Sequence, residues 1–114
     1  MAPMTEDNYT LTGSDDTPIH GYRWKGDSVP RAIVNLAHGM GEHAARYRRF
    51  AQALVDAGYV VYANDHRGHG RTAGTAERHG NLGPAGWRGL VDDLGALNAH
   101  ARAEYPATPL VMFG

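Results

Sequence analysis

The sequence predicts an α/β fold in which helices cover a mostly parallel central sheet. Three short apolar runs bounded by turn residues indicate buried strands at 32–37, 59–63 and 110–113. Two segments with apolar residues at helical spacing, 44–57 and 85–104, separate these runs. Strands that alternate with helices pair in parallel through right-handed crossovers, so helices are expected on both faces of the sheet.

A β-hairpin is expected before the first buried strand. Residues 8–12 are predicted to form its first strand and residues 18–24 its second, with the turn cluster Gly13-Ser14-Asp15-Asp16 between them. The polar residues 25–30 then lead to the first buried strand. The predicted element order is therefore a hairpin followed by β-α-β-α-β.

The two predicted helices each carry an apolar face. The apolar positions are Tyr47, Phe50, Ala51, Leu54 and Val55 in the first helix, and Trp87, Leu90, Val91, Leu94, Leu97 and Ala101 in the second. We interpret the aromatic residues Tyr47, Phe50 and Trp87 as core anchors, and Gly58 as the end of the first helix. The glycine-rich segment 64–84 has no sustained period and is predicted to be mostly loop, with a length that favours a functional or mobile role.

Composition is that of an ordinary globular domain and excludes several classes of protein. The chain has 114 residues, of which 42% are hydrophobic and 20% charged, and this argues against disorder. A net charge of -1 provides no field that would attract nucleic acid, and the absence of cysteine excludes disulfides and thiolate chemistry. The first nine residues lack an apolar signal core, and no run approaches the roughly 18 apolar residues of a membrane span, so a cytoplasmic location is expected.

The first chemical motif is His38-Gly39-Met40-Gly41-Glu42-His43, which lies directly between a buried strand and a helix. Glycines at such a junction let the backbone turn sharply and leave N–H groups uncovered. A free N–H group near a helix N-terminus stabilises a developing oxyanion. The alternative is a plain glycine turn between strand and helix.

The second motif, Asp65-His66-Arg67-Gly68-His69-Gly70-Arg71-Thr72, directly follows the next buried strand. Loops at the carboxyl ends of parallel strands line the ligand crevice of α/β sheets. Asp65 is expected to tie down the following turn, while Gly68 and Gly70 let that turn fold back tightly. The alternative is a structural loop that makes no contact with substrate.

Five histidines, His38, His43, His66, His69 and His79, raise the question of a metal site. Neither an H-E-x-x-H motif nor a cysteine–histidine zinc pattern occurs, and the spacing from Asp65 to His69 matches no metal motif with a known mechanism. We therefore expect neither a metal nor an organic cofactor.

At these two motifs the sequence resembles the monoacylglycerol lipase and lysophospholipase family, which are serine hydrolases with the α/β-hydrolase fold. The pattern HGxGEH, followed about 25 residues later by DHxGHGxS-like residues, is typical of that family. The tail is similar as well, because a helix, Tyr105-Pro106-x-x-Pro109 and an apolar strand lead to Gly114. The resemblance implies that Gly114 is the first glycine of a G-x-S-x-G nucleophile elbow.

The resemblance implies that residues 1–114 are the N-terminal part of a hydrolase core domain. The nucleophile elbow, the cap and the rest of the triad would lie beyond the C-terminus, since Ser14 and Ser28 are not at a strand-to-helix elbow. Met40 matches the position whose N–H group donates to the oxyanion, and the remaining site residues are supporting ones. They are His38, Gly39, Gly41, Glu42 and Arg46 in the first loop, with an ion pair between the last two, and Asp65, Gly68 and Gly70 in the second.

The implied activity is carboxylic-ester hydrolysis of monoacylglycerols or lysophospholipids by acyl transfer to serine. The implied partners are the lipid ester and the C-terminal remainder of the hydrolase, with peripheral membrane contact through the cap. Epoxide hydrolases and prolyl aminopeptidases share the general plan and are alternatives, as is a non-catalytic module or pseudoenzyme. The segment alone is expected to be inactive because it lacks the triad. The family strand order is 1-2-4-3-5, which would leave 110–113 as an apolar edge, so the segment alone is also expected to be poorly soluble or partly unfolded.

Overall fold

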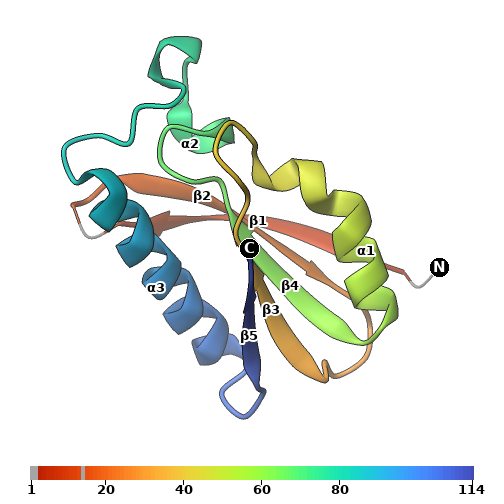
Figure 1. Cartoon of the computed structure of the whole chain (residues 1–114). Helices are drawn as coiled ribbons and strands as arrows, with labels where there is room; N and C mark the ends of the chain where they lie inside the picture. Colours follow the sequence, from red (N-terminus) through yellow and green to blue (C-terminus); the bar gives the residue numbers. More distant parts are fainter. Residues whose placement is uncertain (1–2, 14) are drawn as a thin grey trace.

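The computed structural model describes residues 3–13 and 15–114. Ser14 of the predicted turn and the first two residues of the region predicted to lack a signal lie outside the described residues. Within them, the strands are β1 (Thr5–Thr12), β2 (Pro18–Lys25), β3 (Ala32–Leu36), β4 (Tyr59–Asn64) and β5 (Leu110–Phe113). They form one sheet in the order β1-β2-β4-β3-β5, as the resemblance implied (Figure 1).

The sheet combines an antiparallel hairpin with three parallel strands. β1 pairs with β2 and β2 with β4 in antiparallel register, whereas β3 pairs in parallel with both β4 and β5. The α/β fold class is therefore confirmed. β1 begins at Thr5 rather than at the predicted Asn8, because the pairing with β2 continues to Thr5 opposite Lys25. Side-chain hydrogen bonds from Trp24 to Glu6 and from Arg23 to Asp7 join the same cross-strand pairs.

The helical elements are η1 (Ala44–Tyr47), α1 (Arg48–Asp56), α2 (Gly70–Ala73), η2 (Ala76–Arg78) and α3 (Gly86–Glu104). The predicted helix 44–57 is present, but its first turn is the tighter 3₁₀ helix η1. Gly58 ends it at a φ of +96°, a left-handed conformation that suits glycine. The segment 64–84 contains the short turns α2 and η2, which are too short to show a periodic pattern.

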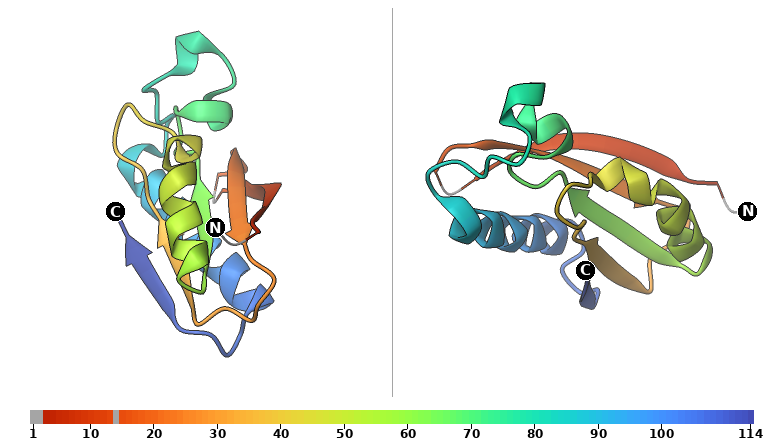
Figure 2. Two further views of the ribbon diagram at one scale, coloured as in Figure 1. Left: turned by 90° about the vertical axis from the view of Figure 1, so that its right-hand side faces the viewer. Right: turned by 45° about the horizontal axis from the view of Figure 1, so that its top comes forward.

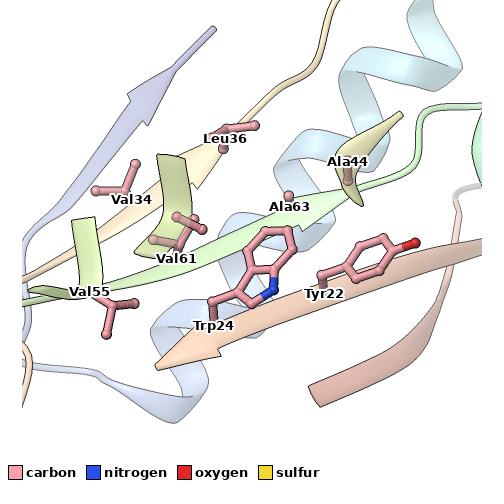
Figure 3. Close-up of a cluster of buried hydrophobic side chains, with 9 residues drawn as sticks. Tyr22, Trp24, Val34, Leu36, Ala44, Val55, Val61 and Ala63 are labelled. Atoms are coloured by element: carbon pink, nitrogen blue, oxygen red, sulfur yellow. The ribbon is translucent and has the colours of Figure 1, made fainter. Parts of the chain in front are cut away.

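One face of the sheet packs against α1 (Figure 3). Its buried residues are Tyr22 and Trp24 of β2, Val34 and Leu36 of β3, Val61 and Ala63 of β4, and Ala44, Ala51 and Val55 of η1 and α1. The rings of Tyr22 and Trp24 stack with their centroids 5.4 Å apart. The Trp24 Nε1–H group donates to Glu6 over 2.7 Å, so the largest core side chain has its polar atom paired.

The opposite face packs against α3, so the two long helices lie on opposite sides of the sheet (Figures 1 and 2). The predicted core face of α3 was partly wrong, because Trp87 is 64% exposed and Val91 48% exposed. The buried residues of α3 are Gly89, Leu90, Asp93, Leu97 and Ala101. The helix is turned this way because Arg67 packs against Gly89 and pairs with Asp93, which draws those two positions inward.

Two other predictions of burial also fail. Phe50 is 37% exposed and contacts Phe113 of β5, with ring centroids 5.1 Å apart, so Phe50 is not a core anchor. Tyr47 is half-buried and packs against the α1 side of the core. β5 was predicted as a buried strand, but Val111, Met112 and Phe113 are 54%, 47% and 49% exposed because β5 lies at the edge of the described sheet.

Candidate functional site

Two loops meet at the carboxyl edge of the sheet, where β3 and β4 end side by side (Figure 1). The first loop is 37–43 and the second is 65–69. They are joined by hydrogen bonds, since the His66 N–H group donates to His38 Nε2 over 2.9 Å and the Gly41 N–H group donates to His69 Nε2 over 3.0 Å. The edge that parallel α/β sheets use for ligands is therefore built from both predicted motifs.

In the first loop, the backbone N–H groups on either side of Met40 are both engaged. The Gly39 N–H group donates to the Glu42 carboxylate over 2.8 Å, and the Gly41 N–H group donates to His69. Within residues 3–13 and 15–114, the Met40 N–H group has no hydrogen-bond partner. Met40 is 61% exposed, and its N–H group is an uncommitted donor that lies between two engaged ones.

Glu42 supports this loop mainly through hydrogen bonds. Its Oε1 atom accepts from the Gly39 N–H group and also from the Tyr47 hydroxyl at 2.6 Å. The bond from Tyr47, helped by the one from Gly39, lowers the pKa of Glu42. The predicted ion pair with Arg46 is present at 3.5 Å, but Arg46 is 67% exposed, and exposed pairs of this kind contribute little.

A hollow of about 270 Å³ lies between the two loops. Met40, Glu42 and His43 line it from the first loop, Gly68 and His69 from the second, and His79 from the segment beyond η2. Met40, the residue with the uncommitted N–H group, thus lines open space, and an oxyanion donor needs such space beside it.

Asp65 is fully buried and ties the starts of two helices together. Its Oδ1 atom accepts the Ala44 N–H group at 2.8 Å, and its Oδ2 atom accepts the Arg71 N–H group at 2.9 Å and the Tyr22 hydroxyl at 3.3 Å. The carboxylate therefore accepts hydrogen bonds from N–H groups in the first turn of both η1 and α2, and its negative charge lies at the N-terminal end of each, where it is stabilising. The expectation that Asp65 ties down the following turn is confirmed.

Gly68 and Gly70 both have positive φ angles, +72° and +48°. A Cβ atom at Gly70 would lie 2.5 Å from the Asp65 carboxylate, and one at Gly68 would lie 2.5 Å from the Asn81 carbonyl oxygen. Both positions are therefore restricted to glycine by conformation and by space.

The rings of His38, His66 and His69 form a buried cluster between the loops. The ring centroids of His38 and His66 are 4.0 Å apart, and those of His38 and His69 are 5.2 Å apart. Burial lowers the pKa of His38 and lowers that of His66 to about 4. In the part of the chain that the structure describes, no group of three metal-ligating residues is arranged to hold a metal ion.

Arg67 is a structural residue of the second motif that sequence reasoning did not identify. It is 2% exposed and forms paired hydrogen bonds to Asp93 of α3, at 2.6 and 2.9 Å, and to Asp15 of the hairpin turn, at 2.6 and 2.7 Å. The partners are 26 and 52 residues away in the sequence, so no local pattern predicts these pairs.

The described residues place no serine at this edge. Ser28 lies in the connection from β2 to β3, which is at the opposite end of β3. Among the described residues, no helix is both long enough and apolar enough to cross a membrane.

Comparison with known proteins agrees with this geometry. Residues 28–114 match the family described as serine aminopeptidase S33. The chain is 36% identical over 114 residues to a monoacylglycerol lipase from Mycolicibacterium smegmatis, covering all of this chain and 39% of the relative. It is 32% identical over 104 residues to human monoglyceride lipase, covering 91% of this chain and 33% of the relative. The chain thus spans less than half the length of these curated relatives.

Solved structures show the same fold. A thermostable carboxyl esterase from Bacillus coagulans in complex with glycerol superimposes with a TM-score of 0.88 at 31% identity, covering 100% of this chain and 36% of the esterase. A lipase in an open form gives 0.88 at 32% identity, covering 96% of this chain and 36% of the lipase. The chain is thus similar in sequence to monoacylglycerol lipases and in fold to carboxyl esterases. Together with the match over residues 28–114, this shows that the chain belongs to the serine aminopeptidase S33 family of α/β-hydrolases.

Proposed function

We propose that this chain supplies the oxyanion-hole loop of a carboxylic-ester hydrolase that acts by acyl transfer to serine. The observation that supports the proposal is the uncommitted Met40 N–H group, which lies beside a hollow while the N–H groups on both sides of it are engaged. Donors that are fixed before the reaction stabilise the charge that develops on a tetrahedral intermediate.

In the proposed reaction, a serine hydroxyl attacks the ester carbonyl while a histidine takes its proton. The carbonyl oxygen becomes an oxyanion and accepts a hydrogen bond from the Met40 N–H group. Collapse of the intermediate expels the alcohol, which takes the proton from the histidine, and water then releases the acid. Gly114 fits the first glycine of G-x-S-x-G, so we place the serine two positions beyond it, with the acid, the histidine and the cap further on.

We propose a lipid ester, a monoacylglycerol or a lysophospholipid, as the substrate. The support comes from the relatives, because the mycobacterial and human proteins are a monoacylglycerol lipase and a monoglyceride lipase. The Bacillus coagulans esterase was solved with glycerol, the alcohol that hydrolysis of a monoacylglycerol would release. We also propose that residues 1–114 alone have no hydrolase activity, since residues 3–13 and 15–114 place no serine at the site.

Fluorophosphonate labelling of the protein isolated from its source tests this proposal. The probe reacts with activated serines, and intact mass shows which polypeptide carries it. We expect the label on a serine in a polypeptide that contains this segment or is bound to it. A 12.3 kDa species that takes no label would contradict the proposal and favour a non-catalytic module.

The role of Met40 is tested by removing its N–H group. Met40→Pro deletes the donor, whereas Met40→Ala keeps it and changes only the side chain. In unlabelled enzyme, whose serine is free to react, Met40→Pro is expected to lower kcat about 100- to 1000-fold. Met40→Ala is expected to stay within about fivefold of wild type, because the donor belongs to the main chain. Equal losses in both variants would show that the side chain, not the N–H group, matters.

Peptide hydrolysis is a second candidate, because the matching family is described as serine aminopeptidase. The same serine chemistry would cleave an N-terminal proline or another aminoacyl amide. A comparison of kcat/KM for a monoacylglycerol and for an aminoacyl anilide distinguishes the two. An aspartate in place of the serine would instead indicate epoxide hydrolysis.

A further inference from the structure

His69 links the two loops at the residue next to the proposed oxyanion donor. The residue is 4% exposed, its Nε2 atom lies 3.0 Å from the Gly41 backbone nitrogen, and its Nδ1 atom lies 2.8 Å from the Arg67 carbonyl oxygen. Both contacts are to main-chain groups, and each of these groups is either a hydrogen-bond donor or an acceptor, but not both. The Arg67 carbonyl can only accept a hydrogen bond, and the Gly41 N–H group can only donate one.

These two contacts determine which nitrogen of His69 carries the proton. Nδ1 must carry it, because Nδ1 donates to the Arg67 carbonyl. Nε2 is then a bare acceptor for the Gly41 N–H group. A ring protonated at both nitrogens would present an N–H group to another N–H group and would lose this bond. The neutral Nδ1–H form of His69 is therefore the form that holds the loop.

Holding Gly41 matters because glycine at this position has wide conformational freedom. Gly41 has a φ of +78°, and a Cβ atom there would have no neighbour within 4 Å, so packing does not fix its backbone. The Gly39 side of Met40 is held by Glu42, and the Gly41 side is held by His69. The Glu42 N–H group also donates to the Gly39 carbonyl oxygen over 3.1 Å and closes the turn around Met40. Without His69, the Gly41 N–H group would lose its acceptor, and the orientation of the peptide unit between Met40 and Gly41 would depend on that one bond.

We propose that His69 is a positioning residue for the Met40 N–H group. Its Nε2 atom accepts a hydrogen bond from the Gly41 N–H group, so this N–H group points away from the proposed oxyanion. The same bond keeps the turn at Met40 in the orientation in which the Met40 N–H group can donate to the oxyanion. This inference rests on the proposed function of Met40. It assigns to the second motif an indirect effect on the reaction, which acts through the main chain of the first loop.

The test compares three variants of the enzyme isolated with its nucleophile. His69→Leu removes the acceptor and keeps an apolar side chain of moderate size. His69→Gln keeps an N–H donor and an oxygen acceptor at a separation similar to that of the two ring nitrogens. His100→Gln, near the C-terminal end of α3, makes the same chemical change away from both loops and is the matched control.

We expect His69→Leu to lower kcat about 10- to 100-fold, because loss of orientation at a donor is costly even when the donor is still present. KM should change less than about threefold, and His69→Gln should recover kcat to within about fivefold of wild type. His100→Gln should match wild type. A structural role alone would lower the amount of folded enzyme without this division between kcat and KM or this recovery.

The outcomes distinguish failure of this inference from failure of the proposed function. Wild-type enzyme that hydrolyses esters and takes the fluorophosphonate label, combined with an unchanged kcat in His69→Leu, would overturn only the role of His69. Wild-type enzyme without hydrolysis would overturn both. Imidazole nitrogen NMR gives an independent measurement, and a His69 ring in the Nε2–H form would overturn the inference even if His69→Leu failed to fold.

Discussion

In the two loops, individual polar side chains accept hydrogen bonds from backbone N–H groups that have no backbone acceptor. Tight glycine turns leave N–H groups outside any regular ladder, and buried N–H groups need acceptors. Asp65 accepts from Ala44 and Arg71, while His38 and His69 accept from His66 and Gly41. The Met40 N–H group lies between the engaged N–H groups of Gly39 and Gly41 and itself has no acceptor among the described residues.

The contact between Gly70 and Asp65 gives the first prediction. Gly70→Ala places a methyl group 2.5 Å from the Asp65 carboxylate at a φ of +48°, so both the backbone and the carboxylate must shift. Gly74→Ala is the matched control, because Gly74 has a φ of +78° but a Cβ atom there meets nothing within 4 Å. Gly74→Ala is expected to cost about 1–3 kcal/mol of unfolding free energy from backbone strain.

Gly70→Ala is expected to cost a further 1–3 kcal/mol or so, because it disturbs hydrogen bonds to a buried charged group. Urea unfolding of the intact protein measures both variants. Equal losses for the two would show that Asp65 does not depend on the space left by Gly70.

The second prediction concerns pH and the buried His66 ring. Burial lowers its pKa from an ordinary 6.5 to about 4. Between those values the unfolded state binds a proton that the folded state does not, so stability falls as pH falls, by about 1.4 kcal/mol per pH unit. The ring is neutral in both states above pH 6.5 and protonated in both below pH 4, so its contribution to the slope is confined to that window.

His66→Gln keeps a donor for the His38 carbonyl oxygen, which His66 Nε2 contacts at 2.9 Å, and removes the titration. Unfolding free energies at pH 7 and pH 5 should therefore differ less in this variant than in wild type. Some dependence should remain, because burial also lowers the pKa of His38. His79→Gln, at an exposed position, should leave the wild-type dependence in place. A full wild-type slope in His66→Gln would contradict the assignment.

At the scale of elements, one buried arginine orients α3. Arg67 pairs with Asp93, and each side chain is 2% exposed. Arg67→Met should cost about 3–5 kcal/mol of unfolding free energy, because it leaves the Asp93 carboxylate buried without a counter-charge. Arg48→Met is the matched control, since Arg48 is 51% exposed in its pair with Glu6 and its loss should cost less than about 1 kcal/mol.

The double variant Arg67→Met with Asp93→Leu should recover most of the loss, because a buried ion pair replaced by apolar side chains is often tolerated. Thermal and urea unfolding measure this recovery. A double variant as unstable as Arg67→Met alone would show that the pair does more than balance charge.

The sequence predicted every strand and both long helices, because their apolar periods are local. It placed the inner face of α3 wrongly at Trp87 and Val91, since the pairing of Arg67 with Asp93 joins residues 26 apart and overrides the apolar pattern. The resemblance and the motifs singled out Met40, Glu42 and Asp65; the hydrogen bonds of Glu42 and Asp65 are seen in the structure, whereas the part of Met40 in the reaction stays a prediction. The histidine cluster was missed because the histidines were weighed only as metal ligands, although adjacent strand ends bring such loops together.

At the scale of the whole molecule, β5 is the feature from which we predict the behaviour of the chain in solution. Val111, Met112 and Phe113 form an exposed apolar edge at which the described sheet ends. Unpaired apolar edges template pairing between chains. We therefore predict that the 114-residue chain alone is poorly soluble or partly unfolded, and a sharp cooperative melt of a monomer would contradict this.

Lysine at Val111 and Phe113 together should raise the soluble fraction severalfold, because charges at an edge oppose strand pairing. Val29→Lys is the control, since Val29 is 89% exposed but lies outside the strands. Light scattering and the soluble fraction after expression measure the effect. An equal gain from Val29→Lys would attribute it to net charge rather than to the edge.

The pairing of Arg67 also bears on the order in which the chain folds. The hairpin β1–β2 needs only residues up to 25, so it is free to form while the rest of the chain is still being synthesised. Its turn, however, is anchored through Asp15 to Arg67, 52 residues later, and through Arg67 to Asp93. Contacts so distant along the chain form late, after the loops between them have closed. Loss of Arg67 should therefore accelerate unfolding more than it slows folding.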